Sequence, residues 1–134
     1  MASPKDEARS PIRVALDASV LMEIYAQKVD LDEEIKKWTG PVEWVIPKPV
    51  EQELAFLEER RSRERKAIRV ARKWMKNAHV KVVETRAQEG DLALIELAEK
   101  GHWVVTQDRK LKQSLKKTNA RILFLRQGKG LEMA

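Results

Sequence analysis

The chain of 134 residues contains no cysteine, which excludes disulfide bonds and cysteine-based zinc sites. It has no apolar run near the ~20 residues that a membrane-spanning helix needs. Its start, MASPKDEARSP, is polar rather than signal-like. We therefore expect a cytoplasmic protein without a membrane segment. The length fits one compact domain, which we place at residues 12–134 after a polar tail at residues 1–11.

Several chemistry-bearing motifs are absent as well. No GxxxxGK[ST] is present, which excludes a P-loop NTPase. No GxGxxG follows the first apolar run, which argues against a Rossmann dinucleotide site. The block DASVL at 17–21 lacks the second aspartate of a DxD phosphotransferase. The only histidines, His79 and His102, are too isolated to predict a zinc pair or a base–nucleophile pair.

Charge, by contrast, is abundant: 36% of the residues are charged and the net charge is +6. Residues 60–81 hold ten Lys and Arg against one Glu, and residues 104–129 hold eight against one Asp. Residues 16–59 instead carry eleven acids and four bases. This polarisation favours a polyanionic partner such as nucleic acid, although a basic helix face can also be merely solvated.

Short β-branched apolar runs alternate with segments of helical periodicity. The predicted strands are residues 12–16, 44–47, 80–84, 102–106 and 121–126. The predicted helices begin at Ser19, Asp32, Pro49, Ser62, Asp91 and Asp108, and QGKGLEMA is expected to be a tail. The alternation predicts a three-layer α/β domain with a central parallel sheet of about five strands.

Four acidic residues follow or accompany these strands. Asp17 directly follows the first strand, and Asp108 follows the fourth with only Gln107 between. Asp91 begins the helix before that fourth strand, and Glu53 lies in the helix after the second. Because ligands bind beyond the carboxyl ends of such strands, we expect the four acids to converge at one edge of the sheet.

Each acid has a plainer interpretation. Asp91 and Asp108 fit the N-cap position of a helix, and a lone Glu53 is most often a solvated helix residue. Asp17 is harder to dismiss, because it has no capping partner other than the helix start at Ser19. The joint pattern, rather than any one acid, carries the functional prediction.

A divalent cation would relieve the repulsion within such a cluster, which otherwise raises at least one carboxyl pKa. Mg²⁺ and Mn²⁺ prefer oxygen ligands, and one or two such ions can activate a water molecule against a phosphodiester. An acidic centre with basic flanks therefore predicts metal-dependent hydrolysis of nucleic acid.

Four blocks of this sequence together resemble the PIN-domain nucleases. They are LDASVL at 16–21, PVEQELAFL at 49–57, GDLALIELA at 90–98 and VVTQDRKL at 104–111. Their order and spacing match over nearly the whole chain, and the chain looks closest to the archaeal group related to the rRNA-processing factor Fcf and to VapC toxins. The resemblance implies that Asp17, Glu53, Asp91 and Asp108 hold one or two Mg²⁺ or Mn²⁺ ions and that the protein cuts single-stranded RNA.

The same resemblance gives roles to their neighbours. Ser19 matches a small polar residue after the first Asp, and Thr106 matches the Thr or Ser before the last acid; both would orient the metal-binding carboxylates. Two positions depart from the family pattern. Leu92 stands where many relatives carry a further Asp, and Gln107 stands where Asn is frequent. Neither departure removes one of the four acids, although metal affinity or rate could be lowered.

Basic residues of the two positive segments are the predicted RNA contacts. They are Arg65, Arg69, Arg72, Lys73, Arg109, Lys110 and Lys112. Trp74 lies among them and could stack on a base, but its helical stripe with Ile68 favours packing in a core or a dimer. The resemblance implies a homodimer through the helix at 62–77, with an antitoxin or a pre-ribosomal complex as partner. The alternative to an enzyme is a non-catalytic RNA-binding or assembly module with the same fold.

Overall fold

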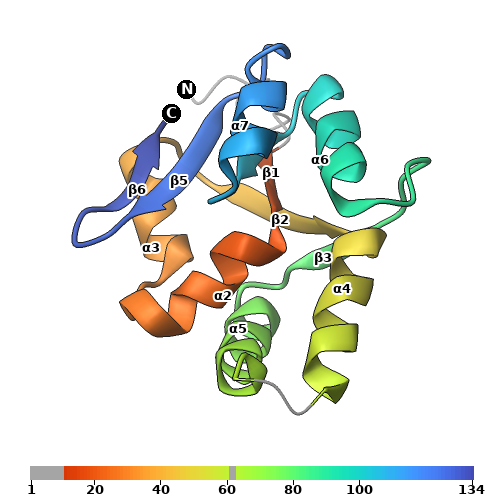
Figure 1. The fold of residues 1–134 in the computed structure, drawn as a ribbon. Coiled ribbons are helices and arrows are strands. Elements are labelled where there is room, and N and C mark those ends of the chain that lie inside the picture. Colours follow the sequence, from red (N-terminus) through yellow and green to blue (C-terminus); the bar gives the residue numbers. More distant parts are fainter. Residues whose placement is uncertain (1–10, 61–62) are drawn as a thin grey trace.

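The structure is a computed structural model in which residues 11–60 and 63–134 are described. Six strands form one sheet in the order β3-β2-β1-β4-β5-β6 (Figure 1). They are β1 (Ile12–Leu16), β2 (Val42–Pro47), β3 (Lys81–Val83), β4 (Trp103–Val105), β5 (Ile122–Arg126) and β6 (Gly130–Met133). All neighbouring pairs are parallel except β5 and β6. The predicted α/β class with a parallel central sheet is confirmed.

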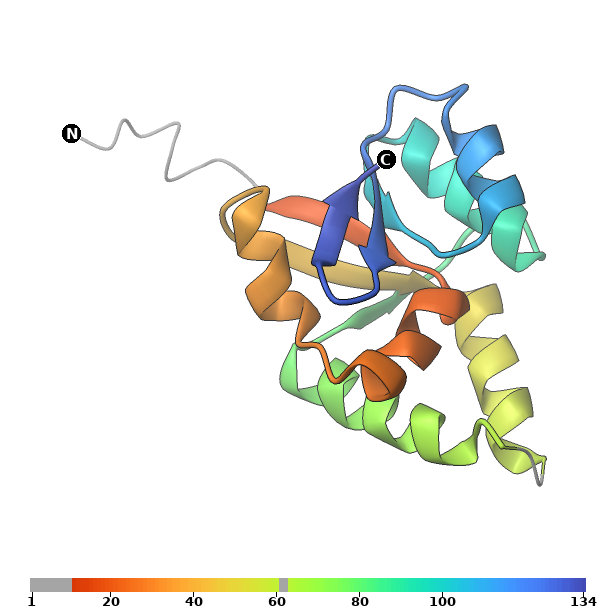
Figure 2. The same cartoon turned by 60° about the vertical axis from the view of Figure 1, so that its left-hand side comes forward.

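Helices cover both faces of this sheet. They are α2 (Ala18–Gln27), α3 (Leu31–Glu34) with the 3₁₀ turn η1 (Ile35–Lys37), α4 (Lys48–Glu59), α5 (Arg65–Asn77), α6 (Gly90–Glu99) and α7 (Arg109–Leu115). Helices α6 and α7 lie on one side, whereas α2, α3 and α5 lie on the other (Figure 2). None of the described helices is long and apolar enough to cross a membrane.

The two central strands end level with each other. In β1 and β4, Leu16 pairs with Val105, and the backbone N–H of Asp17 donates to the Val105 carbonyl at 3.1 Å. Both strands are apolar and fully buried at this end, as expected for strands covered on both faces. The residues that follow them therefore emerge side by side at the carboxyl edge of the sheet.

The sheet has one strand more than the sequence predicts. The segment QGKGLEMA, expected to be a tail, turns back at Gly128 and Gly130 and pairs antiparallel with β5. Both glycines have positive φ, 76° and 77°, a conformation that glycine adopts without the strain a side chain brings. The predicted cap of α5, Ser62, lies outside the described residues, and α5 begins at Arg65.

The edge strand β6 is blocked by side chains from the α3–η1 segment. Glu34 Oε1 accepts the N–H of Leu131 at 2.9 Å, and Trp38 Nε1 donates to the Leu131 carbonyl at 3.0 Å. Lys37 Nζ donates to the carbonyl of Lys129 at 3.1 Å. Occupied backbone groups cannot pair with another chain, so this edge is protected against strand addition.

Substituting Gly130 by Ala should destabilise the protein more than the same change at Gly128. Both positions have positive φ, which costs an alanine about 1 kcal/mol. Only at Gly130 would the new Cβ collide with the Glu34 carboxylate, and moving Glu34 gives up its bond to Leu131, a further ~1 kcal/mol. Urea unfolding of the two variants measures the difference; equal losses would contradict the contact.

Two tryptophans bind the start of α3 to β2 and α5. Trp44 in β2 packs edge-to-face on Trp74 of α5, with ring centroids 5.3 Å apart. Trp44 Nε1 donates to Asp32 at 2.8 Å, and Trp74 Nε1 donates to Asp30 at 3.1 Å. Trp74 thus packs against the hydrophobic core, which favours the core-packing interpretation over base stacking.

Candidate functional site

A buried threonine links the acids that follow β1 and β4. Thr106 is 0% exposed, and its hydroxyl donates to Asp17 Oδ2 at 2.6 Å. The same hydroxyl oxygen accepts the backbone N–H of Asp108 at 3.0 Å. One side chain therefore fixes the Asp17 carboxylate and the backbone of Asp108 with respect to each other, although 89 residues separate Thr106 from Asp17.

Asp17 also receives a hydrogen bond from its own helix. Ser19 Oγ donates to Asp17 Oδ2 at 2.7 Å, the same oxygen that Thr106 contacts. Every buried side-chain N or O atom among the described residues has a partner, and no bond to Oδ1 is formed there. The second oxygen of this otherwise buried carboxylate therefore reaches solvent, where it can bind a cation.

Asp108 shows a similar division between its two oxygens. Its Oδ1 accepts the backbone N–H groups of Lys110 and Leu111 at 2.8 and 3.2 Å, which makes it the N-cap of α7. The capping interpretation of Asp108 is thus correct, but it uses only Oδ1. Within the described chain Oδ2 accepts no hydrogen bond, so the same carboxylate can also serve as a ligand.

Gln107 holds the loop between these acids. Its side-chain amide donates to the Leu125 carbonyl at 2.9 Å and accepts the Leu125 N–H at 2.6 Å. Its backbone N–H donates to Ser19 Oγ at 3.0 Å. Beyond the end of β4, the side-chain amide therefore makes the pair of hydrogen bonds to β5 that a strand backbone would make. The sequence marked Gln107 only as a departure from the family pattern, and no local signal predicts this role.

Glu53 and Asp91 complete the acidic edge from α4 and α6. Withdrawal from bulk water raises the pKa of Glu53, and the charges of Asp17 and Asp91 raise it further. Asp91 has its pKa raised in the same way, by partial burial first and then by Asp17, Asp108 and Glu89. The four predicted acids therefore lie near one another, as the sequence predicts.

Asp91 is not a helix cap, in contrast to Asp108. Glu89 occupies the N-cap position of α6, and Asp91 lies in the first turn. Its carboxylate is thereby free of the capping role that the local sequence suggests for it. Glu89 is a fifth acid at this edge, and only its place two residues before Asp91 could have indicated it.

The chemistry of these donors fits a hard divalent cation. All four predicted acids offer carboxylate oxygens, the ligands that Mg²⁺ and Mn²⁺ prefer. Across residues 11–60 and 63–134, however, no three Asp, Glu, His or Cys side chains form a ready-made metal-binding group.

Removing this repulsion should stabilise the metal-free protein. The raised pKa values of Glu53 and Asp91 mean that folding favours their protonated forms, so their ionisation costs stability as pH rises above ~4.5. In Glu53→Gln/Asp91→Asn we expect a Tm higher by about 1–3 °C in EDTA at pH 7, a small gain because both groups are exposed and screened. The gain should vanish near pH 3; a gain that persists there would contradict it.

The predicted RNA contacts divide into two groups. Arg72 lies in α5, but its guanidinium bonds Glu51 of α4 and contacts Glu58 at 3.3 Å. Lys112 lies over the ring of Phe124, 4.3 Å from its centroid. The other residues are exposed on α5 and α7, namely Arg65, Arg69, Lys73, Arg109 and Lys110. Arg72 therefore fastens α5 to α4, and the second group is the one open to phosphates.

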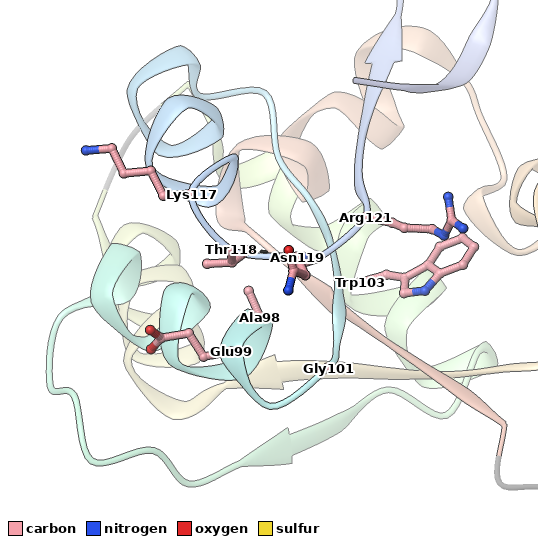
Figure 3. Close-up of a pocket in the computed structure, with 9 residues that line it drawn as sticks. Ala98, Glu99, Gly101, Trp103, Lys117, Thr118, Asn119 and Arg121 are labelled. Carbon is pink, nitrogen blue, oxygen red and sulfur yellow. Dashed lines mark hydrogen bonds between the residues drawn. The ribbon is translucent and has the colours of Figure 1, made fainter.

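A hollow of about 410 Å³ lies away from the acids (Figure 3). It is lined by the end of α6 and the loop before β5, with Arg121 beside the Trp103 ring at 5.6 Å from its centroid. Trp103 begins β4 and Arg121 precedes β5, so the hollow is at the amino ends of these strands. It contains none of the four acids, and Asp17 and Asp108 follow the opposite, carboxyl ends of β1 and β4.

Known proteins are similar to this chain in sequence and in fold. "Ribonuclease VapC9" of Archaeoglobus fulgidus is 36% identical over 116 residues, covering 85% of this chain and 83% of that protein. "Ribonuclease VapC4" of Methanocaldococcus jannaschii is 28% identical over 127 residues, covering 90% and 95%. A structure described as the PIN domain endonuclease Utp24 superposes with a TM-score of 0.76 at 21% identity, covering 92% of this chain and 91% of that one.

A family model confirms the resemblance seen in the four sequence blocks. It is described as a PIN like domain and matches residues 14–128, a stretch that holds most of β1, all of β2 to β5 and all four acids. The TM-score and the two sequence matches agree with it over most of the chain. The chain belongs to the PIN-like domain family.

Proposed function

We propose that the protein is a divalent-metal-dependent endoribonuclease that hydrolyses phosphodiester bonds in single-stranded RNA. The observation that supports this is the proximity of Asp17, Glu53, Asp91 and Asp108 at one edge of the sheet, where their charges influence one another and Thr106 links Asp17 to Asp108. The names of the two sequence relatives support the activity. The fold match supports it through the architecture alone.

The residues divide the work of such a site. Asp17, Asp91 and Asp108 would hold one or two Mg²⁺ or Mn²⁺ ions, and Glu53 would hold an ion or orient the attacking water. When bound, the ions supply charge neutralisation for the phosphate and an activated water. Thr106 and Ser19 hold the Asp17 carboxylate through Oδ2, which would leave Oδ1 for an ion. The exposed basic residues of α5 and α7 bind flanking phosphates.

The experiment that tests the activity is cleavage of a labelled, mixed-sequence single-stranded RNA. Cutting is expected with Mg²⁺ or Mn²⁺ and is expected to fall to background in EDTA. Thermal unfolding of the wild type with Mn²⁺ provides an independent reading, since an ion that binds only the folded state raises Tm. RNA binding without cutting under any metal would instead support a non-catalytic RNA-binding module.

The names of the relatives bear on the biological setting. We propose a VapC-type toxin held by an antitoxin rather than a pre-ribosomal processing factor, because the relatives matched by sequence are the two VapC ribonucleases. A neighbouring small gene that encodes a DNA-binding antitoxin would support this role, and its absence would favour processing. The homodimer through α5 stays a prediction that light scattering can test.

A further inference from the structure

One side of α4 leads away from the acidic edge. Glu53, Phe56 and Arg60 follow one another at spacings of three and four residues, so they share a side of the helix. Phe56 lies about 4.5 Å further along the helix axis than Glu53, and Arg60 about 10 Å. A chain that leaves the acidic edge along α4 would meet Phe56 first and Arg60 next.

The opposite side of α4 is already occupied. Glu51 and Glu58 bind Arg72 of α5, and the face between the two sides buries Val50 and Leu54. On the side that carries Glu53 and Phe56, both of these side chains are exposed among the residues that the structure describes. It is therefore the side of α4 on which a ligand can lie.

Phe56 is an exposed aromatic residue on this side. Its side chain is 51% exposed, although most large apolar residues of this chain are buried. The guanidinium of Arg60 lies 5.2 Å from the centroid of its ring. The guanidinium thus lies over one face of the ring. A half-exposed aromatic ring with Arg over one face has the composition of a nucleobase-stacking surface, in which the other face stacks on a base and Arg adds a cation–π contact.

We propose that Phe56 is a stacking platform for one unpaired nucleobase of the substrate, next to the scissile phosphate. The inference rests on the proposed ribonuclease function and specifies how the RNA lies on it. Arg60 binds the following phosphate or the edge of the stacked base. It begins the sequence run RRSRERK, whose positive charge complements an RNA backbone and opposes an acidic one.

A nucleobase fits this surface better than a protein partner does. Protein interfaces are built around contiguous apolar patches. Among the described residues, the other large apolar side chains that are exposed are Tyr25 in α2, Trp38 directly after η1, Val82 in β3 and Leu92 in α6. Residues 51–53 and 58–59 of α4 and the following Arg60 are polar or charged. A single ring among charges suits a planar, polar-edged ligand. Double-stranded RNA, whose bases are already stacked in pairs, cannot use it.

The test combines a protein variant with an RNA variant. Binding of a short single-stranded RNA to the full chain is measured in EDTA, so that no cleavage occurs, for the wild type and for Phe56→Ala. A series of RNAs that each lack one base at a defined position is then measured with both proteins. With intact RNA, Phe56→Ala should weaken binding roughly 5- to 100-fold.

The abasic series identifies the stacked base. One abasic position should weaken binding to the wild type by a similar factor and leave binding to Phe56→Ala unchanged, since the stack is already lost. Phe56→Trp should retain the wild-type pattern. Val82→Ala is the matched control, because Val82 is also 51% exposed but lies on the edge strand β3. It should bind like the wild type.

Salt dependence separates stacking from charge. Phe56→Ala should leave the slope of log K against log salt unchanged, whereas Arg60→Gln should reduce it by about 0.7, the value for one phosphate of a single strand. A fall in slope with Phe56→Ala would show that the variant disturbs the basic surface, and would overturn the stacking assignment.

The remaining outcomes overturn the proposal in distinguishable ways. If the wild type cleaves RNA with metal but no abasic position depends on Phe56, the stacking platform is wrong and the ribonuclease stands. If Phe56→Ala changes the oligomeric state in light scattering without any abasic dependence, the ring is a contact between copies. If the wild type neither binds nor cleaves RNA, both proposals fail together.

Discussion

Replacing Asp17 by Asn should lower the rate of RNA cleavage by at least about 100-fold while RNA affinity stays the same or rises. Loss of a group that only orients a metal ligand typically costs 10- to 100-fold, so loss of the ligand itself costs at least as much. The amide oxygen of the new side chain can still accept hydrogen bonds from the hydroxyls of Ser19 and Thr106, so the fold should persist. Removing a negative charge at the site reduces repulsion of RNA phosphates. Single-turnover cleavage and binding in EDTA give the two readings.

Three measurements make this result specific. Glu59→Gln likewise removes one negative charge, here from an exposed residue outside the site, and should leave cleavage unchanged. Thr106→Val, which removes the hydroxyl between Asp17 and the Asp108 backbone, should give an intermediate loss that higher Mn²⁺ partly restores. The Tm gain with Mn²⁺ should shrink in Asp17→Asn. An Asp17→Asn protein that cleaves RNA at the wild-type rate would remove Asp17 from the site.

Replacing Trp44 by Ala should lower the free energy of unfolding by about 3–5 kcal/mol, the range for a buried Trp cut back to Ala. Trp44 is 2% exposed, it packs on Trp74 at 5.3 Å, and its Nε1 donates to Asp32. The change therefore removes the largest side chain of the β2 face and leaves the Asp32 carboxylate without this donor. Urea unfolding followed by far-UV circular dichroism measures the loss without relying on tryptophan fluorescence.

Two companion variants divide the Trp44 effect. Trp44→Phe keeps an aromatic ring against Trp74 and loses the N–H, so it should cost about 1–2 kcal/mol. Trp38→Ala removes a tryptophan that is 36% exposed and should cost less than Trp44→Ala. Equal losses from Trp38→Ala and Trp44→Ala would contradict the view that Trp44, packed on Trp74 and bonded to Asp32, is the main contact between α3 and β2.

The order of the elements and the place of the acids were predictable from the sequence. Apolar runs such as 12–16 are continuous because parallel strands are buried on both faces, and that pattern is local. Asp17 and Asp108 could be assigned to the carboxyl edge because each closely follows such a run. Four sequence blocks match the PIN-domain nucleases in order and spacing. Together they indicate this family far more specifically than any single acid does.

Positions with the same local pattern received different roles in three dimensions. Asp91 and Asp108 both resemble N-caps in sequence, but only Asp108 caps its helix, because α6 begins one residue before Asp91, with Glu89 at its cap. Arg72 belongs to a basic helix face, and its acidic partners come from α4. The segment with Gly128 and Gly130 was predicted to be a tail. It forms a hairpin with β5, and a turn in the sequence does not by itself show which strand the following residues pair with.

The sequence by itself determined the fold class, the order of the strands along the chain and which acids stand at strand ends, since these follow from periodicity and from residues close in the chain. Only the tertiary structure decided which oxygen of Asp17 is held and which faces solvent, because Thr106 lies 89 residues away. It likewise decided that the Gln107 side chain bonds to the backbone of Leu125 in β5 and that Glu53 and Phe56 of α4 are exposed. Contacts between distant segments depend on the packing of the whole sheet, and no local pattern encodes them.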